Sequence, residues 1–210
     1  RKNPEEANLR ALRRQISRAK ELSEGRGMIG VNIMAVTQLY EDYVKVCAEA
    51  GADAIISGAG LPTTLPKSAE GYDIKIAPIV SSEKSARVIL KSWDRKYNRT
   101  ADFIVIEGPL AGGHLGFSPN ELADIQSLNY DEEIKKILKV KEGFEEKYGK
   151  KIPVFSAGGI FTADDVKHQI ELGCDGVQAA SRFVATQECD ASDAYKQMYL
   201  SAEEKNIEII

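Results

Sequence analysis

The stretch DFIVIEGPLAGGH, residues 102–114, joins a short apolar segment directly to a glycine-rich turn. Its apolar part, residues 102–107, lacks strict alternation of polar and apolar side chains, which is typical of a parallel strand covered on both faces. The same kind of segment recurs at 28–34, 53–57, 75–80, 152–156 and 176–180. The sequence therefore predicts a parallel sheet of roughly six buried strands.

Amphipathic helices are expected between these strands. Apolar residues recur at three- and four-residue steps near 9–22, 86–97 and 134–144. Ser118 to Glu121 has the pattern of a capping box, and Thr162 with Asp165 is a weaker version. The passages 48–53 and 171–176 each end a helix on glycine and turn into a strand. Strand and helix therefore alternate as parallel βαβ units.

Two α/β architectures contain such units, the doubly wound open sheet and the TIM (β/α)8 barrel. Glycine-rich loops follow nearly every strand instead of one switch point, which favours the barrel. A barrel of this kind needs eight strands and roughly six can be counted, so we expect it to be incomplete at the N-terminus, lacking the first strand–helix–strand. The apolar end at 209–210 indicates a further cut there. We expect residues 1–210 to form a single domain.

Composition excludes several classes of partner. Hydrophobic residues make up 43% and charged residues 29% of the chain, as in an ordinary soluble globular protein. The net charge of −4, without a basic stripe, argues against nucleic acid, and no apolar run is long enough to cross a membrane. Three scattered cysteines and two histidines support no metal site and agree with a reducing cytoplasm.

Two strand ends predict a phosphate site. Gly158 and Gly159 lie between a strand and a helix, where backbone N–H groups and the helix N-terminus can approach an anion. The next strand ends on small residues and a hydroxyl, Ala179, Ala180 and Ser181. Together they indicate a phosphorylated cofactor or substrate. The alternative, that the glycines only form a tight turn, stays open.

The loop after residue 107 contains the candidate for proton chemistry. His114 follows Gly112 and Gly113, which leave room for a planar ligand against the backbone. Imidazole can take or give a proton at neutral pH, although a histidine that only caps a loop remains an alternative. Within or at the end of apolar strands, three polar side chains must find hydrogen-bond partners, from a ligand or from the protein: Asn32, Glu107 and Gln178.

Three motifs in order carry a resemblance to a known family. They are AGGH at 111–114, SAGGI at 156–160 and GVQAASRF at 176–183. With them the chain resembles the nitronate monooxygenases, formerly called 2-nitropropane dioxygenases, whose superfamily includes FMN-dependent enoyl-acyl-carrier-protein reductases. The resemblance implies FMN, with its phosphate at Gly158, Gly159, Ala179, Ala180 and Ser181. It brings the remaining cofactor residues near the ring or ribityl chain: Asn32, Glu107, Gly112, Gly113 and Gln178.

The same resemblance implies the chemistry. His114 matches the family's catalytic histidine, a base that removes the α-proton of a nitroalkane or holds the nitronate while FMN and dioxygen oxidise it. An FMN- and NAD(P)H-dependent enoyl-acyl-carrier-protein reductase is the main alternative. A non-redox phosphate-binding barrel or an inactive fragment is an alternative of another class. The substrate is then a small nitronate or enoyl thioester, and a homodimer stays open.

Two departures from the family pattern stand out. The family's early Gly-Gly-Met-Gly strand has no counterpart, which agrees with the expected missing segment. Ala180 stands where the family has glycine in the last phosphate loop, so one extra methyl is expected to crowd a phosphate there.

Overall fold

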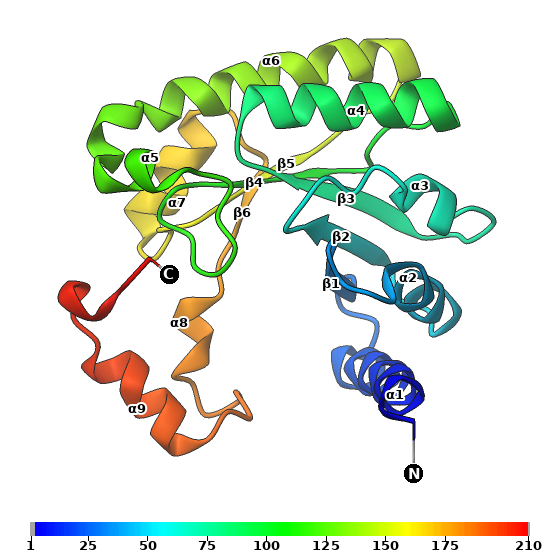
Figure 1. The fold of residues 1–210 in the computed structure, drawn as a ribbon, viewed down its shortest axis with the longest axis horizontal. Helices are drawn as coiled ribbons and strands as arrows, with labels where there is room; N and C mark the ends of the chain where they lie inside the picture. The colour runs from blue at the N-terminus through cyan, green and yellow to red at the C-terminus, as the bar shows by residue number, and fades with distance from the viewer. Residues whose placement is uncertain (1–2, 210) are drawn as a thin grey trace.

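The computed structural model describes residues 3–209. One sheet of six parallel strands runs in the order β1-β2-β3-β4-β5-β6. Figure 1 shows it as an open arc with helices around its convex side, and this half-barrel confirms the predicted α/β fold with about six of eight strands. The strands are β1 (Gly30–Met34), β2 (Ala54–Gly58), β3 (Lys75–Val80), β4 (Ile104–Glu107), β5 (Val154–Ala157) and β6 (Gly176–Gln178).

Helices connect consecutive strands, and α4 and α6 cover the middle of the convex face (Figure 1). Beyond β6, the short α8, α9 and η2 extend away from the sheet (Figure 1). The helical elements are α1 (Pro4–Ser23), α2 (Tyr40–Glu49), α3 (Leu65–Ser68), α4 (Glu83–Tyr97), α5 (Pro119–Ala123), η1 (Ile125–Leu128), α6 (Tyr130–Tyr148), α7 (Ala163–Glu171), α8 (Ser181–Val184), α9 (Asp193–Ser201) and η2 (Glu204–Asn206).

The predicted helix boundaries are confirmed. Ser118 at the start of α5 and Thr162 at the start of α7 both form capping boxes, with Glu121 and Asp165 respectively. The expected glycine turns follow α2 and α7, where Gly51 has φ +81° and Gly173 has φ +105°. Local side-chain hydrogen bonds and left-handed turns therefore set the ends of these helices, as the sequence pattern predicted.

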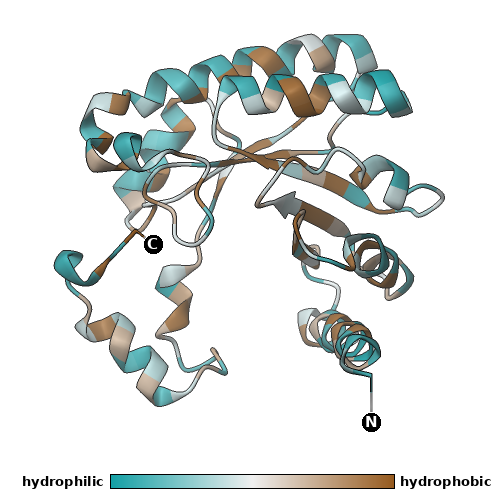
Figure 2. Cartoon of the chain, viewed as in Figure 1, coloured by the Kyte–Doolittle hydropathy of each residue, from teal (hydrophilic) through white to brown (hydrophobic). Residues whose placement is uncertain are grey.

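The two faces of the sheet bury different side chains. On the convex face, strand residues such as Ile55 and Ile106 belong to the same core as helix residues such as Trp93 of α4, and all three are fully buried. The concave face carries a small cluster that contains no helix residue: Ala54, Ala77, Phe103, Val105 and Ala157. Figure 2 shows the hydrophobic residues concentrated in the strands and on the helix faces that meet them.

The edge strands depart from the prediction that every strand is covered on both faces. In β1 only Ile33 is buried, and no residue of β6 is buried. Both edge strands are also shorter than expected. Ile29 precedes β1 and donates its N–H to the Asp53 carboxylate, while Ala179 and Ala180 already turn toward α8.

Three aspartates close the N-terminal ends of the strands in pairs. An aspartate stands just before each even-numbered strand: Asp53, Asp102 and Asp175. The backbone N–H of each aspartate donates to the carbonyl of a residue at the start of the neighbouring odd-numbered strand. The N–H of that same residue donates back to a carboxylate oxygen of the aspartate. All these distances fall between 2.7 and 2.9 Å. The partners are Ile29, Ile76 and Val154.

Candidate active site

Two predicted polar side chains share one rung of the sheet. Glu107 is the ladder partner of Ala157, which in turn is the partner of Gln178. Partners in a parallel ladder point to the same face, and Ala157 belongs to the concave cluster. Glu107 and Gln178 therefore lie on the concave face at the strand ends, with only the methyl group of Ala157 between them.

Asn32 lies on the same face but at the other edge of the arc. Its ladder partner Ile56 packs against the concave cluster, and Asn32 is exposed on β1. The structure thus brings Glu107 and Gln178 together and holds Asn32 apart, on the edge strand at the far end of the sheet.

Burial controls the ionisation of Glu107. The carboxyl group is half-buried, and desolvation raises the pKa of Glu107 above its ordinary value. No ion pair offsets this effect within the described residues. Glu107 is therefore easier to protonate than an exposed glutamate.

The 108–118 loop that carries His114 is held at both ends. At its start, the Tyr130 hydroxyl donates to the carbonyl oxygens of Glu107 at 3.0 Å and Ser81 at 3.1 Å. At its far end, the Phe117 ring packs edge-on against Tyr130 with centroids 5.6 Å apart. The Ser81 hydroxyl donates to the Gly116 carbonyl at 3.2 Å.

No pattern in the sequence indicated a role for Tyr130 or Ser81. Both hold the loop through contacts between residues far apart in the chain: Tyr130 lies 13 positions from Phe117, and Ser81 lies 35 positions from Gly116. Burial, followed by the charges of nearby Glu133 and Glu107, raises the pKa of Tyr130 well above its usual range. Its hydroxyl therefore stays a donor at any physiological pH.

His114 itself is exposed at the outer part of this loop. Among residues 3–209 no hydrogen bond or ion pair to its imidazole is found, whereas the other histidine, His168, lies 3.0 Å from an Asp131 oxygen. A side chain added at Gly112 or Gly113 would meet nothing within 4 Å, and Gly113 has φ +87°. Open space therefore surrounds the loop beside the imidazole.

Gly158 and Gly159 make room for this same loop. Their φ angles are +95° and +72°, and a Cβ on Gly158 would lie 2.9 Å from the Ala111 nitrogen. A Cβ on Gly159 would lie 2.8 Å from the Leu110 side chain. The two glycines thus do form a tight turn with a steric purpose, which was the alternative to a phosphate site.

The donor set around them nevertheless fits an anion. In the part of the chain that the structure describes, no backbone or side-chain acceptor is found for the N–H groups of Gly159 and Ala180, whereas the ladder pairing of Ala157 with Gln178 uses an N–H of Gly158 or Ala179. Unpaired N–H groups at neighbouring strand ends are what a phosphate oxygen requires. The Ala180 backbone has φ −129°, so its methyl group introduces no backbone strain.

A cavity of about 520 Å³ adjoins these loops on the helix side of β6. It is lined mainly by apolar side chains, and Arg182 lies over the Phe161 ring while donating to the Phe161 carbonyl at 2.7 Å. Within residues 3–209, no cluster of three or more potential metal ligands occurs. In the same range no helix is long and apolar enough to cross a membrane.

Together, six parallel strands with interleaved helices and with glycine-rich loops gathered at the strand ends define a protein of the TIM-barrel class. Family comparison then narrows this class. The nitronate monooxygenase family matches residues 2–210, and the chain belongs to that family.

Individual relatives agree with this assignment. A probable nitronate monooxygenase of Staphylococcus saprophyticus is 26% identical over 175 residues, which cover 81% of this chain and 44% of the relative. One from Bacillus subtilis is 30% identical over 112 residues, covering 53% of this chain and 29% of the relative. The chain thus spans less than half the length of these curated relatives.

Solved structures show the same fold. FabK from Thermotoga maritima is 29% identical with a TM-score of 0.70, over 91% of this chain and 52% of that chain. A nitroalkane oxidase from Streptomyces ansochromogenes is 17% identical with a TM-score of 0.57, over 90% of this chain and 50% of that one.

Proposed function

We propose that the protein is an FMN-dependent oxidoreductase that oxidises alkyl nitronates with dioxygen, with residues 1–210 as a single FMN-binding domain. One observation supports this most directly. Gly159 and Ala180, at two neighbouring strand ends, have unpaired N–H groups among the described residues, and Gly159 adjoins Leu110 of the loop that carries His114. Membership of the nitronate monooxygenase family supports the flavin and the reaction class.

The N–H groups of Gly158, Gly159, Ala179 and Ala180, with the Ser181 hydroxyl, would hold the FMN phosphate. Glu107 and Gln178, on the same concave face with Ala157 between them, would donate to or accept from the polar edge of the ring or the ribityl chain. Gly112 and Gly113 would let the planar ring approach the backbone, because neither carries a side chain. Asn32 would contribute from β1, across the arc.

When bound, the flavin supplies the electron transfer between substrate and dioxygen. The protein's own residues would then have to transfer the proton. We propose that His114 removes the α-proton of a nitroalkane or, once protonated, holds the anionic nitronate. Its imidazole has no protein partner among the described residues, so both nitrogens are available to substrate.

An FMN- and NAD(P)H-dependent enoyl-acyl-carrier-protein reductase is the second candidate. The resemblance places such reductases in the same superfamily, and the FabK structures, at 28% and 29% identity, are more similar to this chain than the nitroalkane oxidase at 17%. His114 and the flavin loops are expected in both activities. The two activities differ in the compound that reduces the flavin, which is NAD(P)H for the reductase and the nitronate for the monooxygenase.

The test starts from purified protein loaded with FMN. Under anaerobic conditions NADH is added first and an alkyl nitronate second, while the flavin absorbance is recorded. Bleaching by the nitronate alone supports the monooxygenase, and bleaching by NADH supports the reductase. No FMN binding, or no bleaching by either, contradicts both.

Two variants then test the residues. His114→Ala should retain FMN but lower turnover by about 10²–10⁴-fold, with His168→Ala as the matched control that keeps full activity. Full turnover in His114→Ala would remove this residue from the mechanism.

The phosphate site needs a variant other than Gly159→Val, because any side chain there also collides with Leu110. Ser181→Asp introduces a negative charge on an exposed position beside the proposed phosphate. It should weaken FMN binding by about tenfold or more while leaving riboflavin binding nearly unchanged. Equal losses for both ligands would contradict a phosphate at this loop.

A further inference from the structure

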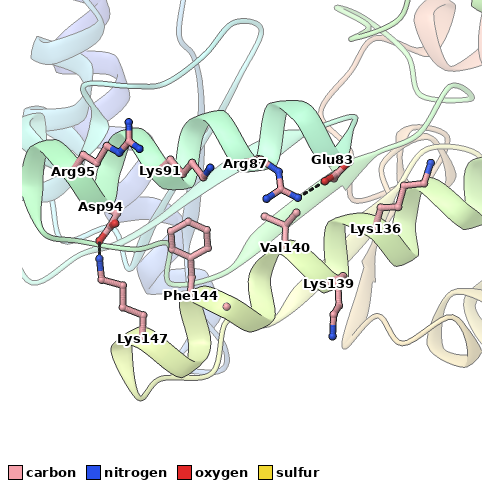
Figure 3. Close-up of a pocket in the computed structure, with 11 residues that line it drawn as sticks. Glu83, Arg87, Lys91, Asp94, Arg95, Lys136, Lys139, Val140, Phe144 and Lys147 are labelled. Carbon is pink, nitrogen blue, oxygen red and sulfur yellow. Dashed lines mark hydrogen bonds and ion pairs between the residues drawn. The ribbon is translucent and has the colours of Figure 1, made fainter.

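A second hollow lies outside the sheet, between two helices of the convex face. A groove of about 610 Å³ runs between α4 and α6 on the convex face of the protein. Along α4 its wall is formed at four-residue intervals by Glu83, Arg87, Lys91 and Arg95. Residues one helical turn apart stand on the same face, so three cations in succession line this wall (Figure 3).

The α6 wall adds Lys136, Lys139 and Lys147, so six cations but only two carboxylates line the groove. Both carboxylates are already paired, Glu83 with Arg87 and Asp94 with Lys147. At the rim, Glu133 and Glu142 pair with two of the α6 lysines, which are more than half exposed. Exposed pairs of this kind contribute little and exchange readily.

Lys91 and Arg95 form no ion pair within residues 3–209. Arg95 lies close enough to Asp94 to help lower the pKa of that carboxyl group, but the hydrogen bonds from Lys147 and Tyr148 to Asp94 act more strongly. The groove is therefore an electropositive surface on a chain whose net charge is −4.

The floor of the groove carries a second, independent feature. Gly143 lies inside the 19-residue helix α6, where glycine costs about 1 kcal/mol relative to alanine. A Cβ at this position would meet nothing within 4 Å, so the packing of this chain does not require glycine. Gly143 is exposed and lines the groove beside Val140 and Phe144, so this part of the α6 wall has no side chain.

We propose that this groove binds an acidic helical segment of a partner protein. The occupant is identified by charge and spacing. Three cations one turn apart along α4 match carboxylates one turn apart on a partner helix, and Gly143 lets that helix approach closely. A free phosphate would need a compact set of donors, whereas these three cations extend over about 12 Å of helix. The proposal is independent of the flavin chemistry.

The binding test uses the whole chain and two synthetic probes. Each is a stapled 16-residue helical peptide of alanine and glutamate, one with glutamates every fourth residue and one with the same residues shuffled. At low salt we expect the patterned peptide to bind about tenfold tighter than the shuffled one. The double variant Lys91→Glu/Arg95→Glu should weaken the patterned peptide by about tenfold or more.

A matched control separates this groove from general surface charge. Lys84→Glu/Lys135→Glu makes a charge change of the same size, with one substitution on each of the two helices that form the groove, at positions that do not line it. It should leave the patterned peptide within about twofold of the parent. Equal weakening by the two double variants, or equal binding of the two peptides, would overturn the proposal.

Gly143 gives a readout in which stability and binding move in opposite directions. Gly143→Ala should raise the melting temperature by a few degrees. Gly143→Leu, which also fills the floor, should keep that gain but weaken the patterned peptide about fivefold or more. Unchanged binding by Gly143→Leu would overturn the close approach. Tighter binding of duplex RNA or polyphosphate, lost in Lys91→Glu/Arg95→Glu, would overturn the choice of a protein partner.

Discussion

Replacing Tyr130 by phenylalanine removes one hydroxyl from the anchor of the His114 loop. That hydroxyl donates to two carbonyl oxygens, of Glu107 and Ser81, at the ends of adjacent strands. The ring remains, so its edge-on contact with Phe117 should persist. The variant therefore separates the hydrogen bond from the packing.

The expected magnitude follows from burial. A buried hydrogen bond contributes about 1 kcal/mol net, and leaving its acceptor unsatisfied costs about 1–3 kcal/mol. Because the carbonyl of Glu107 borders the loop directly, we expect a loss of about 1.5 kcal/mol in global stability. Local opening of residues 108–118 should become about tenfold more frequent.

Amide hydrogen exchange of the 108–118 peptide measures the local part, and urea unfolding measures the global part. Tyr148→Phe is the matched control, because it makes the same change at the other end of α6. There the hydroxyl donates to Asp94 at 2.6 Å, far from the loop. The control should leave exchange of residues 108–118 at the parental rate.

Two results would refute this reasoning. One is exchange of the loop at the parental rate in Tyr130→Phe although the variant is globally destabilised. The other is an equal increase in Tyr148→Phe. Either would mean that the hydroxyl does not hold the loop.

Three further predictions concern charge and packing. Burial by itself raises the pKa of Asp102, but hydrogen bonds from Lys150 and the Ile76 N–H outweigh it and hold that pKa below its ordinary value. Asp102→Asn should therefore lower the free energy of unfolding by about 2 kcal/mol at pH 7, measured by urea unfolding. This difference should shrink as the pH falls below about 3.9, where the carboxylate becomes protonated. Burial raises the pKa of Glu107, so Glu107→Gln should increase the free energy of unfolding at pH 7, with the gain vanishing in acid where both side chains are neutral; a constant difference across pH would contradict this. Trp93→Phe should lose about 2–3 kcal/mol, followed by circular dichroism, because the indole is fully buried and donates to the Pro62 carbonyl at 2.9 Å; a neutral effect would contradict that account.

Local patterns were sufficient to predict the order of strands and helices. An apolar run followed by glycine predicted the strands, and short capping motifs predicted where α5 and α7 begin. They also predicted that Glu107 ends its strand, whereas Gln178 was expected inside a strand at 176–180 and lies at the end of the shorter β6. Glu107 and Gln178 are both ladder partners of Ala157. This depends on the register between neighbouring strands, which the sequence of a single strand does not reveal.

Contacts between segments far apart in the chain could not be predicted from the sequence. Gly158 and Gly159 were predicted to face an anion, yet they also receive Leu110 and Ala111, nearly fifty residues earlier in the chain. Tyr130 was missed for the same reason, since its two carbonyl partners lie 23 and 49 residues away. An aspartate just before a strand is a local signal that could have predicted the reciprocal hydrogen bonds between strand starts. Around Asp53 and Asp175 the sequence predicted only a repeated helix-to-strand turn.

The aspartate closures divide the sheet into two-strand modules. Each reciprocal pair joins β1 to β2, β3 to β4 or β5 to β6, whereas the junctions between pairs lack such a closure. The β2–β3 junction has the Lys75 N–H to the Asp53 carbonyl at 3.0 Å, and the β4–β5 junction has the ion pair of Lys150 with Asp102. Such modules should open as cooperative units, so β2 and β3 would part before β1 and β2 do. Insertions should then be best tolerated in the connections between modules, after β2 and after β4. A longer loop there leaves all three reciprocal aspartate hydrogen-bond pairs intact.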